Sequence, residues 1–172
     1  TRLFDFPYYQ LKEYNLDNAF VTKSKGEWVA TSTQEFIDRG NAISRGLIKL
    51  GVQPNDKIAV ISLTNRTEWN IMDLGVLQVG AQNVPIYPTI SQEDYAYILN
   101  HSGATYCFVS CATVYAKVKA IMDQTALKGV YSFDELEDCD HWSKVEKLGE
   151  DNAIQAEVEA RKEAVLPEML AT

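Results

Sequence analysis

The chain of 172 residues has the length and composition of one globular domain. Hydrophobic residues make up 46% and charged residues 23%, ordinary values that exclude a disordered or fibrous chain. No apolar run approaches the ~20 residues that span a bilayer, and the start lacks the pattern of a secretory signal. The sequence therefore predicts a cytoplasmic protein.

The net charge of −8 is unevenly distributed. Residues 1–130 hold 12 acidic and 12 basic residues, whereas residues 131–172 hold 12 acidic and 4 basic ones. This acidic section predicts a solvated helical face and argues against nucleic acid as a partner.

Cysteine and histidine give no sign of a metal or catalytic site. Three cysteines without a secretory signal imply no disulfide framework. Cys107 lies inside a predicted strand and Cys111 just after it, which is not the paired turn of a structural zinc site. Neither His101 nor His141 has a nucleophile at a recognisable spacing. We therefore predict no metal ligand and no catalytic residue.

The first elements are small. Pro7 suits the first turn of a short helix. Residues 19–23 and 28–32 are strand-like, and the polar turn between them contains Gly26. This pattern predicts a small antiparallel β-hairpin before the main sheet.

A long amphipathic helix follows the hairpin. Ser32 and Glu35 have the spacing of a helix-capping box, and Gly51 suits the left-handed position that ends a helix. One stripe of small or apolar residues repeats every 3.6 positions: Phe36, Gly40, Ile43, Leu47 and Leu50. The helix is therefore expected to cover one face of a sheet.

The centre of the chain alternates strands and helices. Apolar runs at 57–63, 84–87 and 104–110 read as strands, separated by helical patterns at 67–80 and 91–103. Strand, helix, strand at this spacing requires crossover connections. The sequence predicts an α/β fold, with a mostly parallel sheet and helices on both faces.

The same alternation continues toward the end. Residues 114–122 predict a helix, 129–133 a strand, and 150–165 another helix. Ser132 and Glu135 again have capping spacing, which predicts a helix starting there. Without an internal repeat or flexible linker, residues 1–172 read as a single domain piece.

Candidate ligand contacts follow from the predicted topology. Ligands of open parallel sheets bind beyond the carboxyl ends of the strands. At those ends stand Asn65, Arg66, Tyr87, Thr89 and Ser110. The alternative interpretation makes Asn65, Thr89 and Ser110 helix caps and Tyr87 a core residue.

No glycine-rich phosphate loop can be built from this sequence. Of its nine glycines, no two lie closer than five positions apart. A dinucleotide fingerprint needs glycines only two and three positions apart, and a Walker loop needs a lysine directly after its second glycine, whereas none of these nine glycines is followed by lysine.

Three short motifs carry a family resemblance. Residues 65–69 (NRTEW), 84–89 (VPIYPT) and 101–104 (HSGA) occur in that order. They resemble the N-terminal part of AMP-forming long-chain fatty acid CoA ligases, members of the adenylate-forming superfamily. The resemblance is clear over residues 19–110 and looser to Thr172, and the Tyr-Pro-Thr motif favours the long-chain branch.

The resemblance implies that these residues form roughly the first third of such an enzyme. They would be the first part of its large N-terminal domain and would stop before its phosphate-binding loop, because residues 167–172 resemble the lead-in to that loop. By resemblance, the parent uses ATP, Mg and CoA to convert a fatty acid to an acyl-adenylate and then a thioester. The piece alone would be inactive. Peripheral membrane contact and a homodimer remain open as partners.

Two alternatives remain open at this point. One is an adenylate-forming enzyme for another acid, such as a short-chain or aryl acid. The other is a free-standing α/β binding module without catalysis, because fold does not fix function. A self-contained module predicts polar sheet edges, whereas a piece of a larger domain predicts exposed apolar surface or an unpaired edge.

Overall fold

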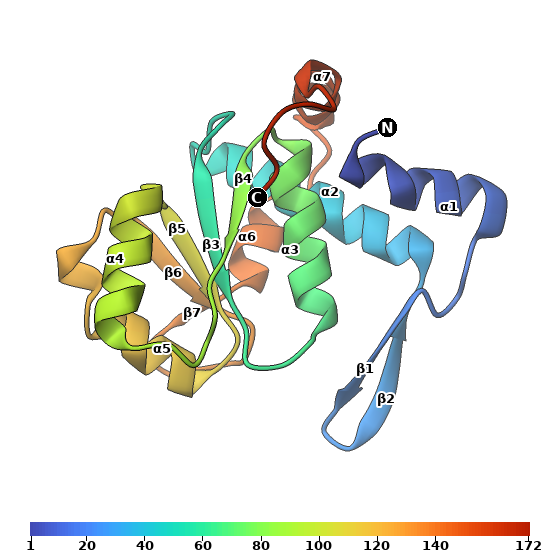
Figure 1. Cartoon of the computed structure of the whole chain (residues 1–172). Helices are drawn as coiled ribbons and strands as arrows, with labels where there is room; N and C mark the ends of the chain where they lie inside the picture. Colours follow the sequence, from blue (N-terminus) through green and yellow to red (C-terminus); the bar gives the residue numbers. More distant parts are fainter.

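The apolar runs of the sequence form the strands of one central sheet, in a computed structural model that describes residues 1–172 (Figure 1). The strand order is β4-β3-β5-β6-β7, and each neighbouring pair is parallel. The strands are β3 (Lys57–Ile61), β4 (Gln82–Pro85), β5 (Tyr106–Val109), β6 (Gly129–Ser132) and β7 (Asp140–His141). The predicted α/β fold is confirmed. Its strand order reverses between β3 and β5, as in doubly wound sheets.

Helices cover both faces of this sheet (Figure 1). The helices are α1 (Phe6–Tyr14), α2 (Thr33–Lys49), α3 (Thr67–Gln78), α4 (Gln92–Ser102), α5 (Ala112–Lys119), α6 (Ser143–Leu148) and α7 (Gln155–Ala164), with short 3₁₀ turns η1 (Leu3–Asp5) and η2 (Met122–Gln124). Successive side chains of β3 point alternately to the two faces of the sheet and pack against the helices there. Ile58 and Val60 face α2, α3 and α6, while Ala59 and Ile61 face α4 and α5. None of the helices combines the length and apolarity needed to cross a membrane.

Helix α3 is buried on nearly all sides. Even its polar Gln78 is fully buried, and the side-chain amide donates to the hydroxyl of Ser44 on α2 at 2.9 Å. Gly75 lets the two helices approach closely, because an added Cβ would overlap Ile43. The α2–α3 pair is thus the main packing unit on its side of the sheet.

The predicted hairpin is also present and projects from the body of the molecule (Figure 1). Strands β1 (Phe20–Ser24) and β2 (Glu27–Thr31) are joined by Lys25 and Gly26, both with positive φ. This is the backbone of a tight two-residue hairpin turn. Trp28 is 71% exposed, so the outer part of the hairpin carries apolar surface.

The predicted helix after Ser132 is wrong. Ser132 ends β6 and pairs with His141 of β7, and the next helix begins only at Ser143. Parallel pairing with β5 and β7 therefore overrides the local capping signal of Ser132 and Glu135.

The strand predicted at 84–87 lies two residues earlier, at Gln82–Pro85. Pro85 is tolerated because β4 is the edge of the sheet.

Helix α4 offers a direct test of capping. The Ser91 hydroxyl accepts a hydrogen bond from the backbone N–H of Asp94 at 3.1 Å. Replacing Ser91 by alanine is expected to lower the free energy of unfolding by about 1 kcal/mol, because one N–H at the helix start loses its partner. Urea unfolding measures this change. Thr89→Ala, two positions earlier and outside any helix cap, is the control and should change stability by less than about 0.5 kcal/mol.

Asp73 on α3 predicts a pH-dependent effect. Burial raises the pKa of its carboxyl group, although the side-chain amide of Asn83, donating at 2.8 Å, lowers it. Because the folded-state pKa is the higher one, stability falls as pH rises through it. Asp73→Asn keeps an acceptor oxygen and removes the charge, so the variant should be more stable than the natural protein at about pH 7 and equal to it at about pH 3. Thermal unfolding at both pH values, with exposed Asp123→Asn as control, checks this.

Candidate functional site

A cleft of about 820 Å³ opens beyond the carboxyl ends of β3 and β4, at the lower end of both strands in Figure 1. It is formed by the loop after β3, the first turn of α3 and the end of β4. Its lining residues are Ser62, Leu63, Thr64, Asn65, Arg66, Trp69, Asn70, Pro85, Ile86, Tyr87 and Pro88. Ligands of doubly wound folds bind beyond the carboxyl ends of the strands, and the cleft lies on that side of the sheet, next to the point between β3 and β5 where the strand order reverses.

The five predicted contact residues differ in whether they line the cleft. Asn65, Arg66 and Tyr87 line the cleft. Ser110 is 2% exposed and lies behind the lining, and Thr89 is exposed outside it. The structure therefore brings three of the five together at one cavity.

The alternative prediction, that these residues are caps or core, is wrong. The cap positions of α3, α4 and α5 are Arg66, Ser91 and Cys111. Tyr87 is 76% exposed. At the start of α3 the backbone N–H of Thr67 has no partner within the helix, and it donates to the hydroxyl of Thr22 on the hairpin at 3.2 Å.

Arg66 ties together three loops at this end of the sheet. Its Nη1 donates to the carbonyl oxygen of Ser110 at 2.9 Å and to Asp134 at 2.7 Å. Its Nε and Nη2 donate to the two carboxylate oxygens of Glu68 at 3.2 and 2.7 Å. The guanidinium also lies over the ring of Phe133, with its carbon 5.6 Å from the ring centroid. At least four of the five N–H donors of Arg66 are therefore hydrogen-bonded to protein groups.

These contacts also stabilise the charged form of Arg66. Burial lowers its pKa, but hydrogen bonds to Glu68 and Asp134 outweigh burial and raise the pKa above the ordinary value. The side chain is only 18% exposed. Arg66 therefore holds the cleft wall in place.

Ser110 completes the same junction from β5. Its hydroxyl accepts the backbone N–H of Leu63 at 3.1 Å, and its carbonyl accepts Arg66. The loops after β3 and β5 are fixed to each other at the point where the strand order reverses. Asn65 and Tyr87 are the predicted residues left with exposed side chains in the cleft.

Trp69 and Asn70 line the cleft but were absent from the predicted set. Both lie on the first turn of α3, and Asn70 donates from its amide to the carbonyl of Arg66 at 3.2 Å. The spacing of four residues between Arg66 and Asn70 is the signal that could have identified Asn70.

The cleft is chemically suited to binding. Aromatic and aliphatic side chains stand beside amide and hydroxyl groups, an arrangement typical of small-molecule sites. Its lining includes no histidine, cysteine or lysine and no carboxylate. A nucleophile paired with a base is therefore not part of this wall.

The residues present do not fit a metal ion by themselves. No three histidine, cysteine, aspartate or glutamate side chains converge. Burial raises the pKa of the Cys107 thiol, and burial together with Asp138 and Asp140 raises that of Cys139 to about 11. Metal-binding cysteines are thiolates, so these two thiols are poor ligands.

The doubly wound sheet and its cleft together define an α/β domain with a candidate ligand site. Within that class, the sequence pattern of the AMP-binding enzyme family matches residues 9–171. The chain belongs to this family. The match extends beyond residue 110, over the part where the motifs alone gave only a loose resemblance.

Individual relatives match the chain as part of longer proteins. A long-chain-fatty-acid–CoA ligase of Mycobacterium bovis is 40% identical over 96 residues, covering 54% of this chain and 16% of the relative. The structure of a long-chain-fatty-acid-CoA ligase from Archaeoglobus fulgidus superposes with a TM-score of 0.72 at 21% identity, covering 87% of this chain and 30% of the other.

The structure of an anthranilate CoA ligase in complex with anthranoyl-AMP also gives a TM-score of 0.72, at 16% identity, covering 86% of this chain and 27% of the other. Both structural matches establish the shared fold. The chain spans less than a third of the length of each of these proteins.

Proposed function

We propose that this chain is the N-terminal portion of a long-chain fatty acid CoA ligase. The observation that carries the proposal is the 40% identity to a long-chain-fatty-acid–CoA ligase over 96 residues, within a family match over residues 9–171. The Tyr-Pro-Thr sequence at residues 87–89, which resembles the long-chain branch, supports the same reading.

In the proposed reaction, a fatty acid carboxylate attacks the α-phosphate of ATP and pyrophosphate leaves. The thiol of CoA then attacks the acyl carbon of the adenylate, and AMP leaves. The 172 residues supply binding surface for this chemistry. They provide the sheet and part of a wall near the acyl and CoA sites, with Tyr87 and Trp69 as its aromatic faces.

The groups that handle phosphate and magnesium belong, in this proposal, to the rest of the longer protein. The residues described contain neither a glycine-rich phosphate loop nor a converging set of metal ligands. ATP, Mg and CoA are therefore proposed as cofactors of the longer protein. The 172-residue piece is expected to be inactive alone.

An enzyme for another acid is the second candidate. The anthranilate CoA ligase superposes as well as the long-chain ligase, with a TM-score of 0.72 in both cases. The fold alone therefore does not distinguish a fatty acid from an aryl acid.

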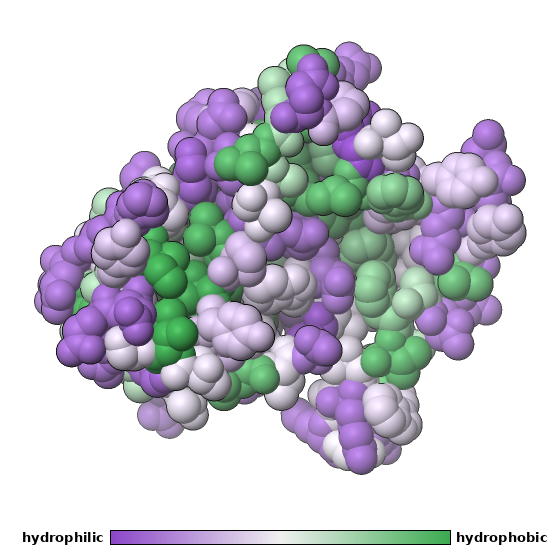
Figure 2. Space-filling view, in the orientation of Figure 1, coloured by the Kyte–Doolittle hydropathy of each residue, from purple (hydrophilic) through white to green (hydrophobic).

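A free-standing binding module is less well supported. Such a module should have polar sheet edges. Apolar side chains instead stand exposed near the β4 edge, namely Leu166, Met169 and Leu170, and Figure 2 shows hydrophobic surface beside β4 on that face.

The proposal includes a cytoplasmic location for the longer protein, with a fatty acid as its substrate. A membrane or a second copy would find its apolar contact at the hairpin, where Val21, Trp28 and Val29 are exposed. Lys23 and Lys25 lie on the same hairpin, and their positive charges would suit an anionic headgroup layer.

Carboxylate-dependent exchange of pyrophosphate into ATP tests the function. The assay compares the 172-residue chain with the natural chain continued past Thr172, each with palmitate, benzoate, acetate or an amino acid. Palmitate-dependent exchange by the longer chain alone is the expected result. Exchange with benzoate only would establish the second candidate, and no exchange with any acid would favour the binding module.

A further inference from the structure

The loop between β4 and α4, residues 86–91, forms one wall of the cleft. Tyr87 and Pro88 belong to the cleft lining, and the side chain of Tyr87 is exposed there. No backbone N–H or carbonyl of residues 87–90 forms a hydrogen bond with another backbone group. Backbone pairing therefore does not fix the shape of this loop, and its position has to come from other contacts.

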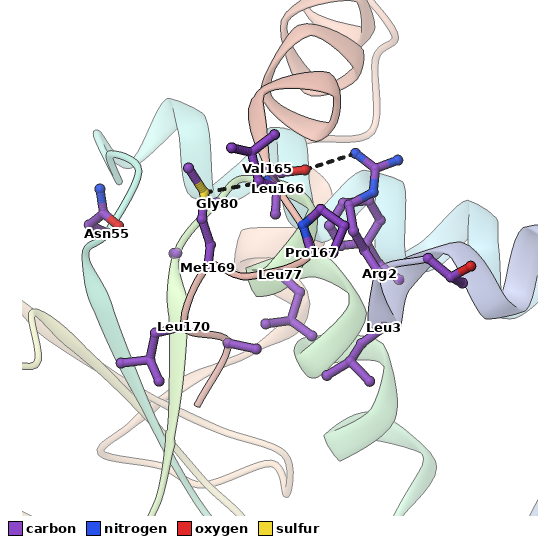
Figure 3. A pocket seen from close by; sticks show the side chains of 14 residues that line it. Arg2, Leu3, Asn55, Leu77, Gly80, Val165, Leu166, Pro167, Met169 and Leu170 are labelled. Carbon is purple, nitrogen blue, oxygen red and sulfur yellow. Dashed lines mark hydrogen bonds between the residues drawn. The ribbon is translucent and has the colours of Figure 1, made fainter.

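The segment after α7 shows how an irregular stretch is held elsewhere in the molecule. The backbone N–H of Met169 donates to the carbonyl of Leu166 at 3.1 Å, and apolar side chains of the segment line a cavity of about 230 Å³ (Figure 3). Arg2 adds a side-chain hydrogen bond to the carbonyl of Val165 at 3.2 Å. The β4–α4 loop lacks the backbone bond, so it depends more strongly on side chains of its neighbours.

Two side chains donate to the carbonyls of the β4–α4 loop. Tyr95 on α4 donates its hydroxyl to the carbonyl of Pro88 at 2.9 Å. Lys117 on α5 donates from Nζ to the carbonyls of Pro88 and Ile90 at 3.2 and 3.1 Å. The two helices lie side by side at the lower left of Figure 1. The Pro88 carbonyl thus accepts two hydrogen bonds, which is its full capacity.

Tyr95 is a rigid and permanent donor. It is fully buried in the core between the sheet and the α4–α5 layer. Burial raises the pKa of Tyr95 to about 12, so the hydroxyl keeps its proton at any ordinary pH. The ammonium group of Lys117 lies 5.5 Å from the centroid of the Tyr95 ring, within the range of a cation–π contact.

Lys117 is not an ordinary surface lysine. Lys119, two positions later on α5, is exposed and pairs with Asp138 at 2.6 Å. Lys117 is half-buried and takes part in no ion pair. Its partners are the two loop carbonyls and the Tyr95 ring. The charge of Lys117 therefore acts on the loop and not on a carboxylate.

We propose that Lys117, together with Tyr95, is a positioning residue of the cleft, which holds the β4–α4 loop so that the side chain of Tyr87 keeps its place in the wall. The inference rests on the proposed function, which makes this wall part of the binding surface for the acid and CoA. Neither Lys117 nor Tyr95 lines the cleft, so both act through the loop. Without them the loop samples several positions, and a substrate that needs one of them binds more weakly.

Proteolysis of the folded 172-residue chain tests the hold on the loop. Thermolysin cuts before large apolar residues, and the bond between Thr89 and Ile90 is of this kind. Lys117→Met keeps the aliphatic stem and loses the ammonium, so cleavage at this bond, relative to other bonds, should be at least about fivefold faster than in the natural chain. Lys119→Met is the matched control and should stay within about twofold of it. Equal cleavage of Lys117→Met and the natural chain would overturn the proposal.

Steady-state kinetics of the natural chain continued past Thr172 test the positioning role. Lys117→Met and Tyr95→Phe should each raise KM for palmitate, CoA or both by roughly fivefold and change kcat by less than about twofold, because the reacting groups belong to the rest of the protein. Lys117→Arg keeps the charge and several donors, so its KM should stay within about twofold of the natural value. A KM unchanged for both substrates in Lys117→Met would contradict the positioning role.

A variant of Tyr87 shows whether Lys117 acts through this side chain. Tyr87→Ala should itself raise KM, and adding Lys117→Met to it should raise KM by less than about twofold more, because the two residues act as one unit. Independent, multiplying effects of the two substitutions would mean that Lys117 does not act through Tyr87, and the proposal would fall.

The two kinds of measurement separate this inference from the proposed function. Faster cleavage of Lys117→Met, without pyrophosphate exchange by the natural longer chain, would keep the hold on the loop and remove the ligase assignment. Exchange activity with an unchanged KM in Lys117→Met would keep the ligase and remove the positioning role.

Discussion

Replacing Gly46 by alanine is expected to lower the free energy of unfolding by about 3 kcal/mol, the upper part of the range for overpacked sites. Gly46 lies on α2 where it crosses α6, and an added Cβ would overlap the backbone carbonyl of Val145. A backbone atom of a packed helix cannot rotate away as a side chain can. In an ordinary exposed helix the same substitution would stabilise by roughly 1 kcal/mol, so the expected effect has the opposite sign.

Urea unfolding at constant m-value measures the change, and the melting temperature should fall by roughly 6–12 °C. Gly51→Ala is the matched control. Its Cβ would meet no atom within 4 Å, but its φ of +86° makes any side chain strained, so about 1 kcal/mol is expected from conformation alone. Equal losses for Gly46→Ala and Gly51→Ala would show that the close crossing of α2 and α6 contributes nothing.

Gly46 also shows where prediction from the sequence stops. The stripe of α2 and the Ser32 cap are local patterns, and the structure confirms both, with the Ser32 hydroxyl accepting from Glu35 at 3.0 Å. The need for glycine at position 46 comes from Val145, a residue far along the chain on α6. No local pattern encodes such a contact, because it exists only after the sheet has set the helices side by side.

In the candidate site, too, some residues could be predicted from local sequence patterns and others could not. The rule that ligands bind at carboxyl ends of parallel strands was sufficient to select Asn65 and Tyr87, both of which line the cleft. It could not separate exposed residues from the buried junction of Arg66 and Ser110. That junction also includes Asp134, in a stretch where capping spacing predicted a helix and the structure has a turn.

The junction predicts a second large effect. Arg66→Met should lower the free energy of unfolding by about 2 kcal/mol, because the Ser110 carbonyl and the half-buried Glu68 carboxylate lose a charged donor. The pair with Asp134 adds little, since that carboxylate is exposed and screened by water. Urea unfolding gives the total. Hydrogen exchange at residues 62–66 and 110–112 should show that the loss is centred on the loops.

Arg66→Lys separates charge from geometry. Lysine keeps the positive charge but cannot form the two parallel bonds to Glu68, nor reach Glu68, Ser110 and Asp134 together from one planar group. We expect it to recover less than half of the loss, and a double-mutant cycle with Glu68→Gln should give a coupling of about 1 kcal/mol. Stability equal to the natural protein would mean that charge alone holds the loops. In that case the positive charge of residue 66 would hold the cleft wall, and the planar, forked geometry of the guanidinium would not be needed.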